Sequence, residues 1–214
     1  MPSELLRLLE VMDRLRSPGG CPWDAEQTHQ SLIKYLLEES YEFIDSVEEN
    51  DRQAMREELG DILLQVYFHS RIAQEHPTDP FSIEEVAAGI ADKLVRRHPH
   101  VFGETRAESS DEVLQNWEKL KAAEKNRTSA TDGIALSQPA LPLITKLLYR
   151  AEKNGINLDL PTTDMNNDVP AEIAIGDALV AAVAAAIKQG IEPEDLLRAR
   201  AREISEEIKR IESL

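Results

Sequence analysis

The sequence contains little cysteine and no long apolar run. Cys21 is the only cysteine in 214 residues, so no internal disulfide can form and a reducing compartment is expected. The amino-terminal segment MPSELLRLLEVMDRLRS is amphipathic and lacks the apolar core of a signal peptide. No stretch of the sequence approaches the length of a membrane span. These absences predict a soluble, cytoplasmic protein that has no membrane partner.

Basic residues are also scarce. The chain has 24 Lys and Arg against 40 Asp and Glu, which gives a formal net charge of −16. On average such a chain repels phosphate backbones and anionic lipid surfaces, which argues against a nucleic-acid partner. An anionic ligand would therefore need a bound cation or a local basic cluster. Hydrophobic residues make up 42% of the chain, so a packed core is expected.

Helical periodicity dominates the pattern of apolar residues, and no convincing strand alternation occurs. We therefore predict an all-α fold. The predicted helices cover residues 3–16, 26–48, 52–75, 82–97, 109–125, 140–154, 169–189 and 192–212. Segments containing Gly or Pro are predicted to separate helices at 17–24, 76–81 and 98–103.

A polar stretch without periodicity, KNRTSATDGIALSQP (125–139), marks the best domain boundary. It contains Gly and Pro, as connecting segments commonly do. We place a linker at 126–139, between a first domain at 1–125 and a second helical module at 140–214.

Carboxylates gather on two neighbouring predicted helices between residues 35 and 68. On the first helix, Glu38, Glu39 and Glu42 lie opposite an apolar arc. Taken alone, this pattern also describes an ordinary amphipathic helix with a solvated acidic face. The second helix is different, because apolar side chains cover most of its circumference and such a helix is expected to be buried.

Glu58 and Asp61 share the narrow polar stripe of that second helix. Buried carboxylates require a paired charge or a metal ion. Gly60 lies between them, and a helical glycine costs about 1 kcal/mol relative to alanine. We explain Gly60 by a close approach of the preceding helix, which would bring Glu39 and Glu42 toward the pair. A hard divalent cation would relieve the repulsion, and oxygen ligands suit Mg²⁺ or Mn²⁺.

The sequence resembles the MazG-type nucleoside triphosphate pyrophosphohydrolases. The acids follow the pattern E-E-x-x-E and then E-x-x-D, and four blocks carry the resemblance in order: GGCPWDAEQTH (19–29), YLLEESYE (35–42), EELGDILLQV (57–66) and KLVRRHPHVFGE (93–104). The resemblance covers residues 1 to about 125. It implies an all-α helical bundle, and an enzyme that hydrolyses NTPs and dNTPs to the monophosphate and pyrophosphate with Mg²⁺. It also implies nucleotide-pool housekeeping with broad base tolerance.

The resemblance implies a role for each acid of the hairpin. Glu39, Glu42, Glu58 and Asp61 would hold metal. The catalytic candidates are Glu38, which would orient or deprotonate the attacking water, and Glu39.

The resemblance also implies substrate contacts outside the acids. Lys93, Arg96 and Arg97 would receive the phosphates, and the alternative is a basic helix end that complements the helix dipole. Trp117 resembles the position that contacts the nucleotide, and a half-buried packing role stays open. We expect Trp23 to be a packing anchor.

The second half of the chain contains a degenerate copy of the segment that carries Glu58 and Asp61. IAIGDALVAAV (173–183) echoes ELGDILLQVYF (58–68), but Ala174 occupies the place of Glu58 and the E-E-x-x-E helix is missing. Asp177 matches Asp61, and acids replace the basic cluster at Glu203, Glu206 and Glu207. We predict a degenerate, non-catalytic helical module.

Two helices alone cannot bury so wide an apolar surface, so we expect a homodimer or a higher homo-oligomer. Two alternatives stay open. One is a narrow-specificity dUTP or dCTP pyrophosphatase. The other is a non-enzymatic helical interaction module whose acids bind a divalent cation such as Ca²⁺ or stay solvated.

Overall fold

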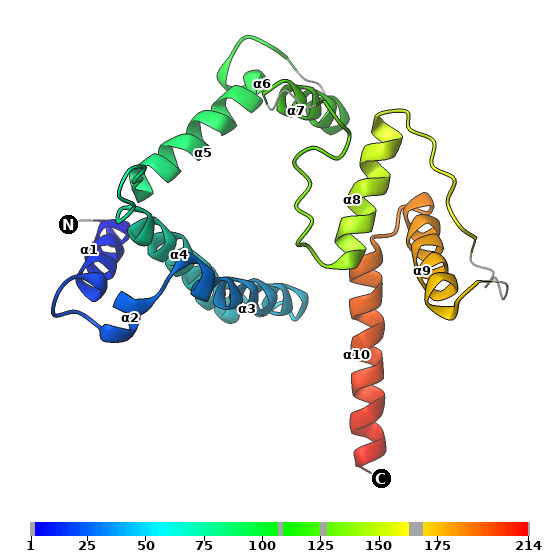
Figure 1. The fold of residues 1–214 in the computed structure, drawn as a ribbon, viewed down its shortest axis with the longest axis horizontal. Helices are drawn as coiled ribbons and strands as arrows, with labels where there is room; N and C mark the ends of the chain where they lie inside the picture. The colour runs from blue at the N-terminus through cyan, green and yellow to red at the C-terminus, as the bar shows by residue number, and fades with distance from the viewer. Residues whose placement is uncertain (1–2, 107–108, 125–127, 163–168, 214) are drawn as a thin grey trace. The chain divides into compact units, whose positions relative to one another are not determined.

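The computed structural model describes residues 3–106, 109–124, 128–162 and 169–213 (Figure 1). These residues form helices and no strand, which confirms the predicted all-α class. The chain divides into two compact units, residues 1–117 and 118–214. This division falls within helix α7 (Ser110–Glu124), before the linker that the sequence pattern indicates at 126–139.

Four helices of the first unit begin at a side-chain cap. Side chains of Ser3, Thr28, Asp51 and Ser82 accept hydrogen bonds from backbone N–H groups in the first turns of their helices. Besides α7, the helices of this unit are α1 (Glu4–Arg16), α2 (Pro22–Glu26), α3 (His29–Glu48), α4 (Arg52–Ala73), α5 (Ile83–Arg97) and α6 (Pro99–Phe102).

Two short helices correct the predicted loops. α2 and α6 lie partly or wholly in segments that the sequence assigns to connections, and each begins with a proline, Pro22 or Pro99. Proline is favourable in the first turn of a helix, where its missing N–H would have no partner.

The core of the first unit lies where α1 and the antiparallel pair α3 and α4 meet (Figure 1). Its buried side chains are Met12, Leu32, Tyr67 and Phe68. The prediction that α4 is buried nearly all round is wrong, because Leu59 is 53% and Val66 38% exposed. α4 packs against α1, α3 and α5, and no other described helix covers the rest of its surface.

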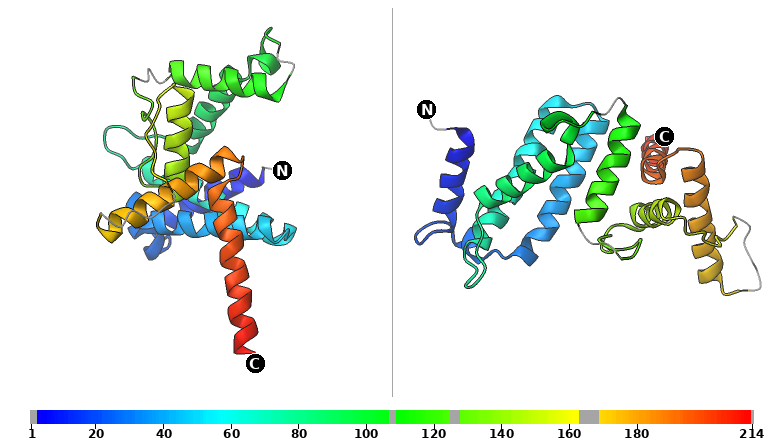
Figure 2. Two further views of the ribbon diagram at one scale, coloured as in Figure 1. Left: turned by 90° about the vertical axis from the view of Figure 1, so that its right-hand side faces the viewer. Right: turned by 90° about the horizontal axis from the view of Figure 1, so that it is seen from above.

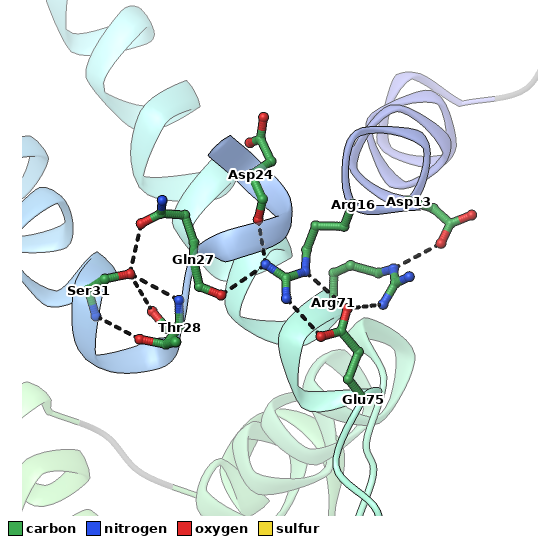
Figure 3. A network of polar contacts seen from close by, with 8 residues as sticks. All are labelled: Asp13, Arg16, Asp24, Gln27, Thr28, Ser31, Arg71 and Glu75. Atoms are coloured by element: carbon green, nitrogen blue, oxygen red, sulfur yellow. Dashed lines mark hydrogen bonds and ion pairs between the residues drawn. The ribbon is translucent and has the colours of Figure 1, made fainter. Parts of the chain in front are cut away.

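Arg16 fixes the connection between α1 and α3. Its side chain is only 5% exposed. The guanidinium donates to the backbone oxygens of Asp24 (2.5 Å) and Gln27 (3.0 Å), and to Oε2 of Glu75 (2.7 Å) (Figure 3). Arg71 also donates to Glu75 at 2.9 Å. We call Arg16, Asp24, Gln27 and Glu75 the Arg16 network.

The connection turns sharply before α2. A Cβ at Gly20 would lie 2.3 Å from the backbone oxygens of both Arg14 and Leu15, so only glycine fits there. The turn is closed by backbone hydrogen bonds from Gly20 to Ser17 and from Cys21 to Leu15, each 2.8 Å long. The tight turn therefore fixes the position of α2 beside α1.

The second unit contains α8 (Ala140–Lys153), α9 (Ala171–Lys188) and α10 (Pro193–Glu212). Small side chains dominate its buried positions: Ala151, Ala174, Ala181, Val183 and Ala184. α10 contacts both α8 and α9, and its carboxyl-terminal half extends beyond them (Figure 2, left). Over both units, no helix in the described segments combines the length and apolarity that crossing a bilayer requires.

Candidate active site

Three carboxylates converge on the hairpin of α3 and α4. Glu39 lies on α3, and Glu58 and Asp61 lie one turn apart on α4. Each offers one carboxylate oxygen, and these three oxygens lie within 4.8 Å of one another. All three residues are half-buried. Antiparallel packing of the two helices thus brings together residues that are far apart in sequence, as the sequence pattern predicts.

Glu42, the fourth predicted ligand, lies beside this cluster. It is exposed. Burial raises the pKa of Glu58, followed in size by the charges of Glu42 and Asp61, and a hydrogen bond between Glu42 and Glu58 adds to the rise. Glu42 is therefore within hydrogen-bonding reach of a cluster member.

The electrostatics at Glu39 show the same crowding of like charges. Burial raises its pKa most, and the carboxylates of Asp61, Glu42, Glu58 and Glu38 raise it further. Glu38 makes the smallest of these contributions and is itself exposed. Glu38 thus lies at the margin of the cluster, open to solvent.

The donor set fits a hard divalent cation. It consists only of carboxylate oxygens, half-buried and mutually repelling, which Mg²⁺ and Mn²⁺ favour. In the described parts of the chain, none of the three carboxylates forms an ion pair with Lys or Arg. A cation therefore offers the charge compensation that the protein itself does not supply.

Gly60 does not have the role that the sequence predicted. A Cβ at this position would meet no atom within 4 Å, so the approach of α3 to α4 does not require glycine. Gly60 is exposed, on a part of α4 that no described helix covers.

The predicted phosphate-binding residues lie on α5, away from the carboxylates. Lys93 is half-buried, Arg96 is exposed and Arg97 is only 8% exposed. Among the described helices, α5 contacts only α4 and α6, and it leads away from the α3–α4 hairpin (Figure 1). Within one chain, the basic residues of α5 therefore do not meet the carboxylates of the hairpin.

The structure joins Arg97 to Trp117. The Arg97 guanidinium carbon lies 5.9 Å from the centre of the Trp117 ring, and the rings of His98 and Trp117 are edge-to-face at 5.0 Å. His98 also contacts the backbone oxygen of Leu94 at 2.7 Å, which holds it at the end of α5. Two of the predicted substrate-binding residues thus form one group.

Sequence reasoning missed two polar groups. Arg16 and Glu75 are separated by 59 positions, so no local motif indicates their pairing. The rings of His29 and His69 stack, with their Nδ1 atoms 2.8 Å apart, and burial lowers the pKa of His69. Trp23, expected to be a packing anchor, is 50% exposed.

The second unit lacks an equivalent cluster among its described residues. Ala174 is 5% exposed and packs in the core, whereas Asp177 is exposed. Glu203, Glu206 and Glu207 form ion pairs one turn along α10 with Arg200, Lys209 and Arg210.

Comparisons with known proteins point to one family. The model of the MazG nucleotide pyrophosphohydrolase domain matches residues 27–102. The chain is 46% identical over 202 residues to an uncharacterized 26.1 kDa protein of Streptomyces cacaoi, covering 93% of this chain and 78% of that protein. It is 36% identical over 222 residues to the nucleoside triphosphate pyrophosphohydrolase/pyrophosphatase MazG of Thermotoga maritima, covering 97% and 85%.

A third relative is longer than this chain. The identity to the nucleoside triphosphate pyrophosphohydrolase of Escherichia coli K12 is 45% over 159 residues, which cover 72% of this chain and 60% of that enzyme. The chain therefore spans less than two thirds of that relative.

Proposed function

This chain belongs to the MazG family of nucleotide pyrophosphohydrolases, and from this premise we propose that it hydrolyses nucleoside triphosphates to the monophosphate and pyrophosphate with Mg²⁺. It is a hydrolase. The observation that carries the proposal is the half-buried carboxylate cluster of Glu39, Glu58 and Asp61. Mn²⁺ is the substitute that the same oxygen ligands favour.

The carboxylates have two roles in the proposed reaction, binding the cation and activating the attacking water. Glu39, Glu58 and Asp61, with Glu42 beside them, hold the cation site. A bound divalent cation supplies positive charge to the triphosphate oxygens and to the charge that develops on pyrophosphate as it leaves. Glu38, exposed at the margin, orients the attacking water and accepts its proton. Attack at the α-phosphorus then breaks the bond to the bridging oxygen and releases pyrophosphate.

We assign phosphate and nucleotide contacts to the group on α5 and α7: Lys93, Arg96, Arg97 and Trp117. Their charge and the contact between Arg97 and Trp117 support this assignment. Because α5 leads away from the α3–α4 hairpin (Figure 1), a second copy of the chain supplies the basic end of α5 to this hairpin in our proposal. The proposed assembly is a homodimer.

Apolar side chains exposed on the two surfaces concerned support the homodimer. Contiguous exposed apolar surface is a mark of an interface. The hairpin exposes Leu37 (51%), Tyr41 (47%) and Leu59 (53%), and α5 exposes Ile90 (45%) and Leu94 (41%). Mixing two inactive variants tests the assembly, one changed at Asp61→Asn and the other at Lys93→Met. Shared sites recover activity in the mixture, and sites built within single chains do not.

A nucleotide panel tests the activity itself. The protein is incubated with Mg²⁺ and each of the common NTPs and dNTPs, and the products are separated by chromatography. Monophosphate and pyrophosphate are expected with most bases. Diphosphate and free phosphate as main products contradict the reaction. Turnover of dUTP or dCTP alone supports the narrow-specificity alternative, and cation binding with no turnover supports the interaction module.

We further propose that the second unit is structural and that the protein works in the cytoplasm. Three glutamates on the surface of α10 pair with basic residues of the same helix, which supports a structural role. They are Glu203, Glu206 and Glu207. The single cysteine supports the reducing location.

A further inference from the structure

Three basic side chains and a tyrosine share one face of α8 in the second unit (Figure 1). Lys146, Tyr149, Arg150 and Lys153 are spaced at i, i+3, i+4 and i+7, which places them within one arc of the helix. The apolar side chains of α8 follow the other side, where Ala151 is buried in the core of the unit. α8 therefore carries a basic face beside an apolar one, and we call the four residues the α8 basic face.

Tyr149 gathers the two lysines of this face. Nζ of Lys146 lies 5.5 Å from the centre of the Tyr149 ring, and Nζ of Lys153 lies 5.6 Å from it. Cation–π attraction holds an ammonium group near an aromatic ring. The ring thus keeps two like charges close together, and a bound anion would relieve the repulsion between them.

Arg150 adds a guanidinium that is only 6% exposed. Its Nε is closed off from solvent and has no acceptor. Its two Nη nitrogens have no hydrogen bond to a described residue either, but they are not closed off, so the outer edge of the guanidinium reaches water. Burying a charge without a partner is unfavourable, so an anion that binds at this edge would stabilise the unit.

Carboxylates do not neutralise the α8 basic face. Across the described parts of the chain, none of its three bases forms an ion pair. Glu152, the one acidic residue of α8, is not three or four positions from any of them, the spacing at which helical side chains pair. On α10, by contrast, Arg200, Lys209 and Arg210 each pair with a glutamate. The α8 basic face therefore keeps three positive charges available to a ligand.

The chemistry of this face fits a short chain of phosphates. Ammonium and guanidinium groups donate charge-assisted hydrogen bonds to phosphate oxygens, and the arginine fork matches their geometry. The backbone positions of Lys146 and Lys153 are about 10 Å apart along the helix axis, so the donors are spread over more than one phosphate group. A long polyanion such as nucleic acid would extend past this short face, where the net charge of −16 repels it.

We propose that the α8 basic face binds the phosphate chain of inorganic pyrophosphate or of a nucleoside triphosphate. Lys146, Arg150 and Lys153 donate to the phosphate oxygens, and Tyr149 holds the two lysines in place. The proposed reaction consumes one of these anions and releases the other, so the non-catalytic unit would sense substrate or product. That consequence rests on the proposed function, whereas the binding itself does not.

Calorimetric titration of the full chain with inorganic pyrophosphate tests the site. EDTA is present, so no cation screens the hairpin carboxylates and they repel the anion. We expect one saturable site per chain. Its affinity should fall at least about tenfold in the double variant Lys146→Gln, Lys153→Gln and in Arg150→Met, because each change removes charge-assisted hydrogen bonds. Unchanged affinity in the folded double variant overturns the proposal, and this variant still decides the question if Arg150→Met does not fold.

A matched double variant separates local binding from net charge. Lys188→Gln, Lys209→Gln removes the same charge from α9 and α10 of the same unit, and the affinity should stay within about twofold of the wild-type value. Equal losses in the two double variants overturn the proposal. Lys93→Met is the control for the bases of α5 and should also leave the pyrophosphate site intact.

A comparison of anions identifies the source of the phosphate chain. Orthophosphate, pyrophosphate, tripolyphosphate and an α,β-methylene nucleoside triphosphate are titrated in the same way. A nucleotide that binds more tightly than tripolyphosphate identifies the nucleoside triphosphate as the ligand, and equal affinities identify the inorganic anion. Orthophosphate that binds as tightly as pyrophosphate overturns the proposal, as does a single-stranded oligonucleotide that binds more tightly than pyrophosphate.

These outcomes are separable from those of the proposed reaction, because the titrations involve no turnover. If the wild-type protein binds pyrophosphate through the α8 basic face but hydrolyses no nucleotide, only the proposed function fails. If it hydrolyses nucleotides but binds no pyrophosphate in EDTA, only the anion site fails.

Discussion

Arg16 and Arg150 each lie near the end of a helix, α1 in the first unit and α8 in the second, and both are buried. Arg16 has partners for its charge in Glu75 and in the two carbonyls of its network. Arg150 has none for its Nε among the described residues. Because a buried donor without an acceptor is unfavourable, the hydrogen bonds of Arg16 stabilise the first unit more than Arg150 stabilises the second.

The two units also differ in the helices that contain a Gly-Asp pair, α4 with Gly60 and Asp61 and α9 with Gly176 and Asp177. In α4, Glu58 and Asp61 form a half-buried carboxylate cluster with Glu39 of α3. In α9, Ala174 replaces the glutamate and is buried, as are Ala181 and Ala184. The small side chains of α9 let helices pack closely. Where α4 carries the carboxylate of Glu58, α9 therefore carries the core side chain of Ala174.

The largest expected effect compares the two aspartates. Asp61→Asn removes a charged ligand at nearly constant shape, and we expect turnover with Mg²⁺ to fall by about 10²- to 10³-fold. The matched change, Asp177→Asn, affects an exposed side chain outside any cluster and should leave turnover within about twofold. Rates are measured per folded active site. Loss of activity in Asp177→Asn with the fold intact would give the second unit a part in catalysis.

The next effect compares the arginines. Arg16→Met strips the connection of its charge-assisted hydrogen bonds, and we expect the free energy of unfolding to fall by about 3 kcal/mol. Arg150→Met removes a buried charge that lacks a partner at Nε and should be neutral or stabilising. Urea denaturation measures both, and equal losses in the two variants would contradict the difference drawn between the units.

The raised pKa values of Glu39 and Glu58 predict a pH dependence with opposite signs for two quantities. Protons compete with the cation, so apparent Mg²⁺ affinity should weaken once pH falls below those raised pKa values, by up to about tenfold per pH unit for each proton displaced. The metal-free fold binds more protons at these sites than the unfolded chain does. Acidification should therefore weaken the repulsion among these carboxylates, and the free energy of unfolding of the metal-free protein should rise.

Glu75 provides the control for that pH dependence. Hydrogen bonding to Arg16 lowers its pKa below the ordinary value of 4.5, so its stabilising effect is present above 4.5 and lost as pH falls through the lowered value. Measurements between pH 7 and 5 thus exclude Glu75, whereas His69, whose pKa burial lowers, acts against the rise in stability over this range. The double variant Glu39→Gln, Glu58→Gln should remove the rise in metal-free thermal stability seen by calorimetry, and persistence of the rise would assign it to other groups.

The smallest expected effect compares the two glycines. A Cβ at Gly60 or Gly176 meets no atom within 4 Å, so alanine at either position should stabilise its helix by about 0.5–1 kcal/mol. Thermal unfolding reports this change. Reduced dimer formation or activity in Gly60→Ala alone would place a close helix contact between two copies of the chain.

Periodicity predicted most of the helices, and the structure adds side-chain caps at their starts. Thr28 and Ser82 begin capping boxes, and these local signals reach only a few residues, as does the structure that they specify. The pairing of α3 with α4 was predicted from a close approach at Gly60, although the structure shows that the packing there does not require glycine. This pairing was sufficient to predict the convergence of Glu39, Glu58 and Asp61.

Features that depend on distant contacts were not predictable in this way. The partnership of Arg16 and Glu75 joins α1 to the far end of α4, and no spacing rule encodes it. The position of α5 relative to the α3–α4 hairpin also depends on contacts between distant residues, and the sequence pattern does not specify it. Helix α2 was missed although Pro22 is a recognised signal for a first turn.

The turn before α2 has a consequence for the exchange of amide hydrogens with solvent. The amides of Gly20 and Cys21 donate to carbonyls at the end of α1, in a connection that the Arg16 network fastens to α4. Their exchange therefore requires the connection to separate from the helices that hold it. In a segment rich in glycine and proline, which usually exchanges at once, these two amides should exchange as slowly as those of the α1 core.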